Sequence, residues 1–212
     1  CAMSSSTRRH ITRIGSLLGL CGCLMAVPAA RAAVLEGVTV DDAVQVAGRR
    51  LQLHGAGVSR SWLVRVYAIA LYLPERSASL AEVRQAEGPR RIAIALMRDV
   101  SAEDFRSAIT DQLSCEDPGV DRAALQGPAR LLVQAVSRRP QGLRRGDLLT
   151  LDWVPGTGTV VELNHQPFIE PVRGRAFYDA LLGVWLGEQV SDTALRAQLL
   201  GAPASQLVVS RN

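Results

Sequence analysis

One long stretch of strand-forming residues constrains the fold more than any other part of the sequence. It runs from Leu51 to Pro74 and reads LQLHGAGVSRSWLVRVYAIALYLP. Gly55 and Gly57 interrupt it early, and a dense series of β-branched, aromatic and leucyl residues follows. The pattern predicts a short strand, a glycine turn and then one long strand over residues 59–73.

Both faces of this predicted long strand are mostly apolar. Alternate side chains of a strand point to opposite faces. The even-numbered residues from Arg60 to Tyr72 therefore share one face, and the odd-numbered residues from Leu63 to Leu71 share the other. Two apolar faces are typical of a central strand, and we expect an arginine or tyrosine on such a strand to point into a cleft or along an edge.

The segment 1–33 has the pattern of a secretory signal peptide. Three arginines precede an apolar run over residues 14–27, and the small-residue sequence AARAA follows soon after it. A basic start, an apolar segment and an Ala-x-Ala site mark such a signal, and we predict cleavage after Ala32 or Ala33. A retained membrane anchor is the alternative, but the run is shorter than the roughly 20 residues that a spanning helix needs. We therefore expect a secreted, periplasmic protein with no integral membrane span and one domain over residues 34–212.

The mature chain would carry no net charge. The sequence contains no lysine, and of its 24 arginines four precede residue 33, which leaves 20 arginines against 20 acidic residues. A neutral chain lacks the basic surface of a nucleic-acid-binding protein. The absence of lysine also excludes Schiff-base chemistry.

Few residues suggest a metal, a cofactor or a nucleophile. Cys115 is the one cysteine after residue 33, so one mature chain cannot hold a disulfide scaffold, and we interpret Cys115 as a buried or incidental thiol. His54 and His165 lie far apart in the sequence, which makes a metal site a weak hypothesis. We expect no cofactor. Acidic residues at 99, 103 and 104 cluster where a helix is predicted to begin, a position at which carboxylates complement the helix dipole.

The remaining pattern predicts an α+β protein. The chain has a long run of strands with helices grouped between them and at the end, which differs from a repeated strand–helix–strand plan. The predicted elements are strands in 34–40 and 45–55 with a hairpin at Gly48, a helix at 77–87, a strand from Arg90, a helix at 101–113, a helical segment at 121–139 split at Gly127-Pro128, strands at 148–153 and 159–163, and helices at 175–186 and 191–200.

Four segments carry a family resemblance. They are the GAG sequence with VYAIALYLP, then RDVSAEDFRSAITDQL from Arg98, LLTLDWVPGTGTVVELN from Leu148, and FYDALLGVWLGEQVSDTALRAQLLG from Phe177. In this order they resemble the chalcone isomerase family, in particular its bacterial chalcone-isomerase-like branch, over most of residues 36–201. The resemblance implies an antiparallel β-sheet covered on one face by a layer of helices, an open-faced sandwich with a ligand cleft between sheet and helices.

Active members of that family close a phenolate oxygen onto an enone, and they need donors for the negative charge that develops on the ketone oxygen. The resemblance places the family's arginine at Ser59, with Arg60 one residue later, and its strand threonine at Tyr67. The tyrosine, lysine and asparagine of the following helix become Phe105, Ala108 and Gln112, and a threonine of a late helix becomes Val184.

Almost every polar catalytic group of the family is therefore missing. A preorganised donor in such a site supplies about 3 kcal/mol, which phenylalanine, alanine and valine cannot replace. We interpret the fold as kept and the isomerase chemistry as lost, and we name no catalytic residue.

Non-catalytic relatives in the family bind fatty acids, with an arginine and a tyrosine on the carboxylate. The resemblance makes Arg60 or Arg65, together with Tyr67, the candidates here. Arg65 and Tyr67 share a strand face, whereas Arg60 would need a bulge to reach Tyr67. The alternative is an arginine at a strand edge that pairs with a surface carboxylate, with Tyr67 as core packing. The predicted ligand-binding residues are Arg60, Arg65, Tyr67, Phe105, Ala108, Gln112 and Val184.

We therefore predict a non-catalytic protein that binds a small amphipathic acid, such as a fatty acid, in an apolar cleft. One alternative is an intramolecular lyase or isomerase acting on an enone-like substrate, with Tyr67 as proton donor and an arginine as oxyanion partner. Another is a partner-binding structural protein whose cleft is filled by its own side chains. An open, polar-anchored cavity favours the first two over the third.

Overall fold

The computed structural model describes residues 32–61, 64–114, 121–188 and 190–202. The predicted signal segment up to residue 31, Cys115 and the turn at 117–119 lie outside these ranges. The strands are β1 (Ala32–Leu35), β2 (Val38–Asp41), β3 (Ala43–Val46), β4 (Arg49–Ser61), β5 (Val64–Leu73), β6 (Arg90–Leu96), β7 (Leu148–Val154), β8 (Gly158–Leu163) and β9 (Gln166–Pro167). The helices are α1 (Leu80–Gln85), α2 (Ala102–Ser114), α3 (Arg122–Ser137), α4 (Ala176–Leu186) and α5 (Thr193–Leu199).

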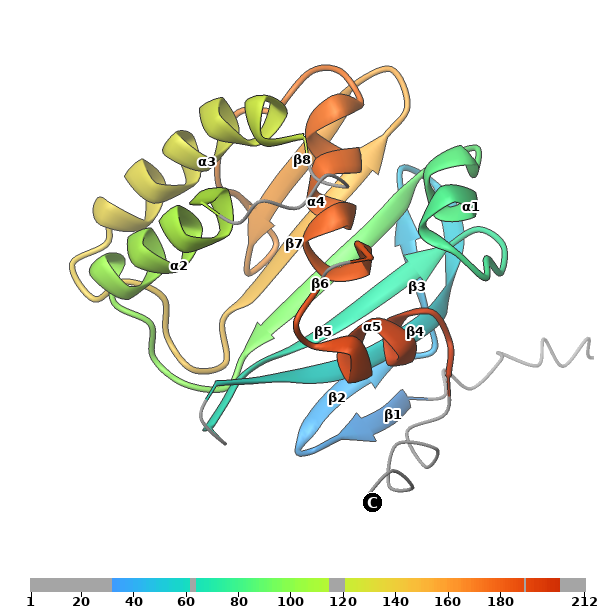
Figure 1. Cartoon of the computed structure of the whole chain (residues 1–212), viewed down its shortest axis with the longest axis horizontal. Coiled ribbons are helices and arrows are strands. Elements are labelled where there is room, and N and C mark those ends of the chain that lie inside the picture. The colour runs from blue at the N-terminus through green and yellow to red at the C-terminus, as the bar shows by residue number, and fades with distance from the viewer. Residues whose placement is uncertain (1–31, 62–63, 115–120, 189, 203–212) are drawn as a thin grey trace, which may run out of the picture.

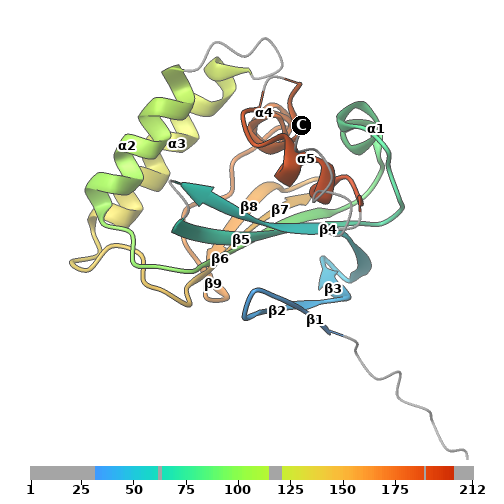
Figure 2. The ribbon, with the colours of Figure 1, turned by 60° about the horizontal axis from the view of Figure 1, so that its bottom comes forward.

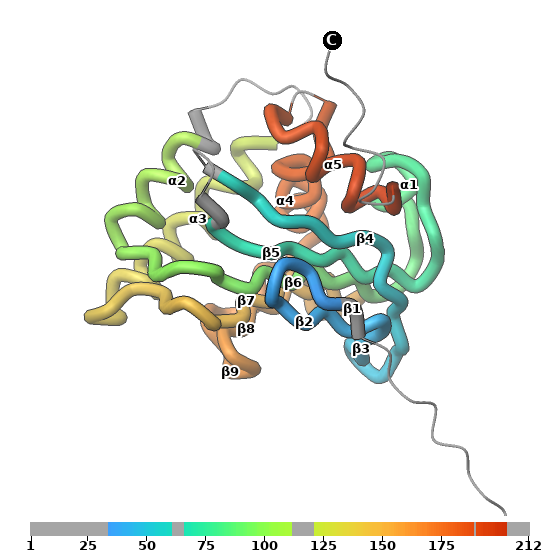
Figure 3. The backbone as a smooth tube through the Cα atoms, turned by 90° about the horizontal axis from the view of Figure 1, so that it is seen from below, coloured from blue at the N-terminus to red at the C-terminus, as the bar shows by residue number. Residues whose placement is uncertain are grey.

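The main sheet is antiparallel throughout the described residues and has the order β3-β4-β5-β6-β7-β8-β9. The helices lie on one face of this sheet (Figures 1 and 2). The hairpin of β1 and β2 lies on the other face (Figure 3). This arrangement confirms the predicted α+β fold with helices on one face. No helix of the described residues is both long and apolar enough to cross a membrane.

The two glycines of the GAG sequence lie inside β4, so the predicted glycine turn is wrong. A Cβ on Gly55 would lie 2.1 Å from the backbone oxygen of Gln198, and one on Gly57 would lie 2.5 Å from Leu195 Cδ1. Glycine is needed here because α5 lies directly against β4, a role that strand glycines often have. The chain reverses between Ser61 and Val64, which are paired, so the predicted long strand is two strands of a hairpin.

The prediction that both faces of the long strand are buried is confirmed for β5. This strand lies between β4 and β6 in the sheet. Ile69 and Leu71 belong to the main core beneath the helices. Ala70 and Tyr72 belong to a second core on the opposite face, which includes residues of β2 and β3. The β1–β2 hairpin therefore explains why the strand shows no polar face.

Two tight hairpins begin the fold. Residues 34–40 were expected to form one strand, but the chain turns at Glu36 and Gly37, whose φ angles are 49° and 92°. Ala47 and Gly48 make the second turn with φ angles of 47° and 75°, which confirms the hairpin predicted at Gly48. Two consecutive residues with positive φ match the handedness of twisted strands, and glycine at the second position relieves the strain.

The helices begin at side-chain caps. The Ser101 hydroxyl accepts a hydrogen bond from the backbone N–H of Asp104 across 3.0 Å, so that the serine at the start of the predicted helix 101–113 caps α2. The Asp192 carboxylate caps α5 by accepting a hydrogen bond from the backbone N–H of Leu195. The predicted break at Gly127-Pro128 is wrong, because α3 continues through Pro128. Its buried residues, which tie both halves to the core, are Leu125, Ala129, Leu132 and Val136.

Candidate functional site

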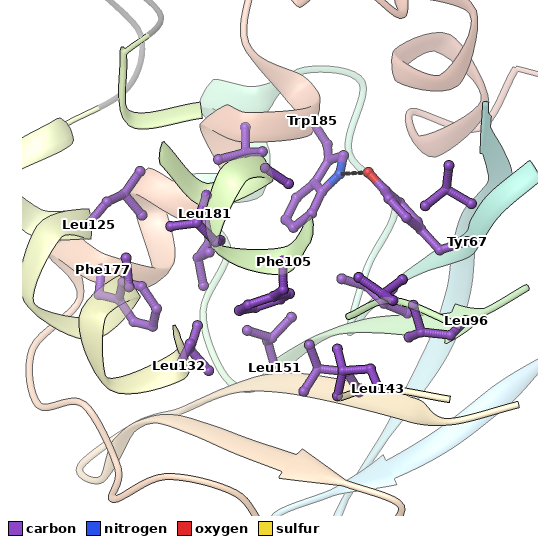
Figure 4. A pocket seen from close by; sticks show the side chains of 18 residues that line it. Tyr67, Leu96, Phe105, Leu125, Leu132, Leu143, Leu151, Phe177, Leu181 and Trp185 are labelled. Carbon is purple, nitrogen blue, oxygen red and sulfur yellow. Dashed lines mark hydrogen bonds between the residues drawn. The ribbon is translucent and has the colours of Figure 1, made fainter. Parts of the chain in front are cut away.

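An apolar cavity of about 250 Å³ lies between the helix layer and the sheet. It is bounded by β5, β6 and β7 on one side and by α2, α3 and α4 on the other (Figure 4). This volume is close to the lower end of the range for sites that hold a small organic molecule. The lining residues are Val66, Tyr67, Ile94, Leu96, Val100, Phe105, Ala108, Ile109, Leu125, Ala129, Leu132, Leu143, Leu149, Leu151, Phe177, Leu181, Val184 and Trp185.

The register of the sheet brings the strand residues of the lining together. Tyr67 pairs with Leu96, and Ile94 pairs with Leu149. Residues paired across antiparallel strands have their side chains on the same face. Alternation along β6 and β7 then adds the neighbouring apolar positions to that face. The floor of the cavity is therefore a continuous apolar surface of three strands.

The helices present the opposite wall at helical spacing. On α2, Phe105, Ala108 and Ile109 line the cavity, and residues three and four positions apart lie on one helix face. On α4 the same spacing brings Leu181 and Val184 to the cavity. Phe105 and Val184 are only half-buried, because the space in front of them is open.

Two polar side chains meet at one end of the cavity. Trp185 Nε1 donates a hydrogen bond to Tyr67 Oη across 3.0 Å (Figure 4). An indole N–H only donates, so the Tyr67 oxygen accepts and keeps its own hydrogen for another partner. Among the 18 described lining residues, only Tyr67 and Trp185 have polar side-chain atoms. A ligand in this cavity therefore meets one free hydroxyl donor and otherwise hydrocarbon.

The structure brings four of the predicted site residues together around the cavity. They are Tyr67, Phe105, Ala108 and Val184. The side chains of Arg65 and Gln112 lie outside the described part of the structure. Whether any of these residues binds a ligand stays a prediction.

Arg60 does not line the cavity. Its guanidinium forms an ion pair with Glu36, at the turn of the β1–β2 hairpin, and 46 % of its side chain is exposed. That hairpin lies on the face of the sheet opposite the helices (Figure 3). A register shift between Ser59 and Arg60 is present, but it does not bring Arg60 to Tyr67. Arg60 has the surface ion pair that the alternative interpretation expected of a strand-edge arginine.

Sequence reasoning did not assign Trp185 or the strand residues of β6 and β7 to the site. A signal for the strands was present, because the alternating apolar residues of IAIAL and LLTL already indicated which side chains share a face. Trp185 lies in the segment 175–186 that was predicted to be a helix, but its hydrogen bond with Tyr67 joins residues 118 positions apart. No local pattern predicts such a contact.

Other groups considered from the sequence have structural roles in the described residues. Asp99 accepts a hydrogen bond from the backbone N–H of Arg145 across 2.7 Å. Glu103 forms an ion pair with Arg106 one helical turn later. His54 is buried, and burial lowers the pKa of its imidazole. No cluster of three potential metal ligands is found among the residues that the structure describes.

Comparison with known proteins identifies the family of this chain. A model of the family described as chalcone isomerase-like matches residues 32–201, which is most of the chain. The chain belongs to the chalcone isomerase-like family. The match includes every element that lines the cavity, and it confirms the resemblance that the four sequence segments carried.

A solved structure agrees at the level of the fold. The crystal structure of the fatty-acid binding protein AtFAP1 of Arabidopsis thaliana is similar to this chain, with a TM-score of 0.58 and 15 % sequence identity. The similarity covers 80 % of this chain and 96 % of the Arabidopsis chain. Comparison with curated protein sequences gives no match.

Proposed function

We propose that this protein binds a small amphipathic acid, such as a fatty acid, in the cavity and does not turn it over. The observation that carries the proposal is the composition of the lining, in which 16 of 18 described residues are purely apolar and the two polar ones meet at one end. An acyl chain would lie along the apolar walls. Its head would accept a hydrogen bond from the hydroxyl of Tyr67.

Each buried methylene contributes about 0.8 kcal/mol, so an acyl chain supplies most of the binding free energy in such a cavity. The hydroxyl of Tyr67 fixes which end of the ligand lies near β5. A carboxylate also favours a cation, and the sequence offers Arg65, two residues before Tyr67 in β5. We include Arg65 in the proposal as the partner of the carboxylate.

The family and the fold support this proposal over catalysis. The similar Arabidopsis protein is itself a fatty-acid binding protein. Isomerisation of an enone requires several preorganised donors around the ketone oxygen. The described lining offers one free hydroxyl, so we rank an intramolecular lyase as the second candidate, favoured only by the presence of Tyr67 itself as a proton donor.

The experiment is a titration of the purified, delipidated protein with saturated fatty acids of increasing chain length, read by displacement of a fluorescent fatty acid. We expect saturable one-to-one binding with an optimum chain length. Arg65→Met should weaken binding of the acid but not of the matching fatty alcohol, because only the acid carries a charge. Absence of binding at any chain length would contradict the proposal, and turnover of an added chalcone would favour the lyase.

Secretion is a separate proposal. It is supported by the basic, apolar and small-residue pattern of the segment 1–33. Mass spectrometry of the protein recovered from the periplasm of a Gram-negative expression host should give a mature chain that begins at Ala33 or Val34. An uncleaved chain retained in the cytoplasm would contradict it.

A further inference from the structure

A second group of buried polar side chains lies at the other end of the sheet. Arg90 pairs with Trp153, and Trp153 pairs with Thr159, so the three residues form one row across β6, β7 and β8. Tyr67 pairs with Leu96 at the opposite end of β6. This row of Arg90, Trp153 and Thr159 is therefore separate from the apolar cavity that Tyr67 lines.

The guanidinium of Arg90 is fully buried, and only one of its three nitrogens donates hydrogen bonds to described residues. Its Nη1 donates to the backbone oxygen of Val83 across 2.5 Å and to that of Arg84 across 3.2 Å. Its Nε and Nη2 are buried without a hydrogen-bond partner among the described residues. These two nitrogens form the edge with which an arginine binds a carboxylate through two parallel hydrogen bonds. That edge of Arg90 is open.

The neighbouring Arg91 shows the same Nε and Nη2 edge bound to a carboxylate. Arg91 points to the other face of the sheet, where its Nε donates to Asp152 Oδ1 across 2.7 Å and its Nη2 donates to Asp152 Oδ2 across 2.6 Å. Arg90 has no acidic side chain within ion-pair distance among the described residues. Of these two adjacent arginines, only Arg91 has a carboxylate hydrogen-bonded to its guanidinium among the described residues.

Two aromatic rings lie near the guanidinium, and two buried hydroxyls, one of them in the row, have no partner among the described residues. The Tyr178 ring centroid lies 5.5 Å from Arg90 Cζ, and the Trp153 ring centroid lies 6.0 Å from it. The hydroxyl oxygens of Tyr178 and Thr159 are buried and have no partner among the described residues. The two rings attract the cation, but they leave its Nε and Nη2 protons unsatisfied. A buried charge with unsatisfied donors is costly unless another group completes the site.

We propose that the Nε and Nη2 edge of Arg90 binds a small planar oxyanion of the carboxylate class, such as formate or bicarbonate. Two oxygens of such an anion match the two N–H groups in the way that Asp152 matches Arg91. Tyr178 and Thr159 supply hydroxyl donors on the same side of the sheet. The anion neutralises the buried guanidinium and completes its hydrogen bonding.

A surface hollow lies beside Trp153. The hollow has a volume of about 670 Å³ and is formed by Trp153, the turn between β7 and β8, and Glu170, Pro171, Arg173 and Gly174. Trp153 is half-buried and contacts Arg90 on its other side. Arg90 does not line the hollow, so the proposal includes a movement of the Trp153 side chain that lets the anion reach the guanidinium. Arg173 on the hollow attracts anions, while Glu170 on the same wall opposes them.

The proposal is tested by measuring the Tm of the purified protein in sodium formate and, at equal concentration, in sodium chloride. A ligand present at about ten times its Kd shifts the folding equilibrium about elevenfold, so we expect a higher Tm in formate. Arg90→Met should abolish this difference. Arg91→Met is the matched control and should retain it, although loss of the pair with Asp152 lowers its overall stability.

A formate response that persists in Arg90→Met, or a wild-type protein with the same Tm in both salts, would overturn the proposal. If Arg90→Met does not fold, a high-resolution crystal structure of the wild-type protein grown in sodium formate decides instead. Planar density that bridges Nε and Nη2 of Arg90 is the expected result. Density for water molecules alone at Nε and Nη2 would contradict the proposal.

Discussion

Trp185 Nε1 and Tyr67 Oη are 3.0 Å apart and join α4 to β5 through a hydrogen bond. The bond connects the helix layer with the sheet at one end of the apolar cavity (Figure 4). Because the tryptophan must donate, it orients the Tyr67 hydroxyl so that the phenolic proton is available to a ligand. Apart from this indole, the described residues around the Tyr67 hydroxyl in the cavity are apolar.

Tyr67→Phe should lower the affinity for a fatty acid about tenfold. It removes one hydrogen bond to a charged group, which contributes about 1.5 kcal/mol or more. The displacement titration measures the effect. Tyr72→Phe is the control, because Tyr72 lies in the same strand but in the core of the opposite face. Equal affinity of Tyr67→Phe and wild type would show that the ligand head lies elsewhere.

Val184→Phe should block the cavity without harming the fold. Val184 is a half-buried lining residue of α4, and the larger ring would occupy space that is open in the wild type. We expect more than tenfold weaker binding of long-chain acids and a Tm equal to or above that of wild type, because filling a cavity is commonly stabilising. Unchanged affinity in a folded variant would exclude this cavity as the binding site.

Gly55→Ala should destabilise the protein by about 3 kcal/mol. The new Cβ would lie 2.1 Å from the backbone oxygen of Gln198 and 2.6 Å from that of Leu199, so α5 would have to move away from β4. Gly127→Ala is the matched control in α3, where a Cβ meets nothing within 4 Å. It should stabilise by about 0.5–1 kcal/mol, because alanine is the better helix former. Urea unfolding compares the two variants, and equal effects would contradict the close contact.

Alkaline pH should weaken the fold through Tyr72. Burial, with the negative charge of Asp41 as a second cause, raises the pKa of Tyr72 to about 12 from an ordinary value of 10.0. Tyr72 therefore contributes stability that is fully present below pH 10 and is lost as the pH rises from 10 toward 12. Between pH 9 and pH 11 the wild type should lose about 1 kcal/mol more than Tyr72→Phe in urea unfolding. An identical loss in both proteins would refute this assignment.

The sequence predicted the fold where periodicity and capping decide it. The alternation of β6, the capping pattern at Ser101 and the two apolar faces of β5 all follow from local patterns. The errors lie where a contact distant in sequence decides the structure. Gly55 is a glycine because of α5, which comes much later in the chain, and α3 runs through Pro128 because both of its halves pack on the core.

The site shows the same division. Alignment of motifs with the family brought Tyr67, Phe105, Ala108 and Val184 to one cavity, because each lies on a face set by strand or helix periodicity. Arg60 was a candidate partner of Tyr67 that needed a bulge to reach it on one long strand, whereas the two residues lie on different strands of a hairpin and Arg60 pairs with Glu36. The open edge of Arg90 left no local pattern in the sequence, because it depends on which distant side chains the fold brings near the guanidinium.

Native mass spectrometry of the protein purified without delipidation tests the central claim most directly. Wild type and Val184→Phe are purified side by side, and the bound molecules are extracted into organic solvent and identified. We predict a fatty acid that accompanies wild type at up to one molecule per chain and is reduced in Val184→Phe. A wild-type protein that is empty and also takes up no added fatty acid would contradict the account.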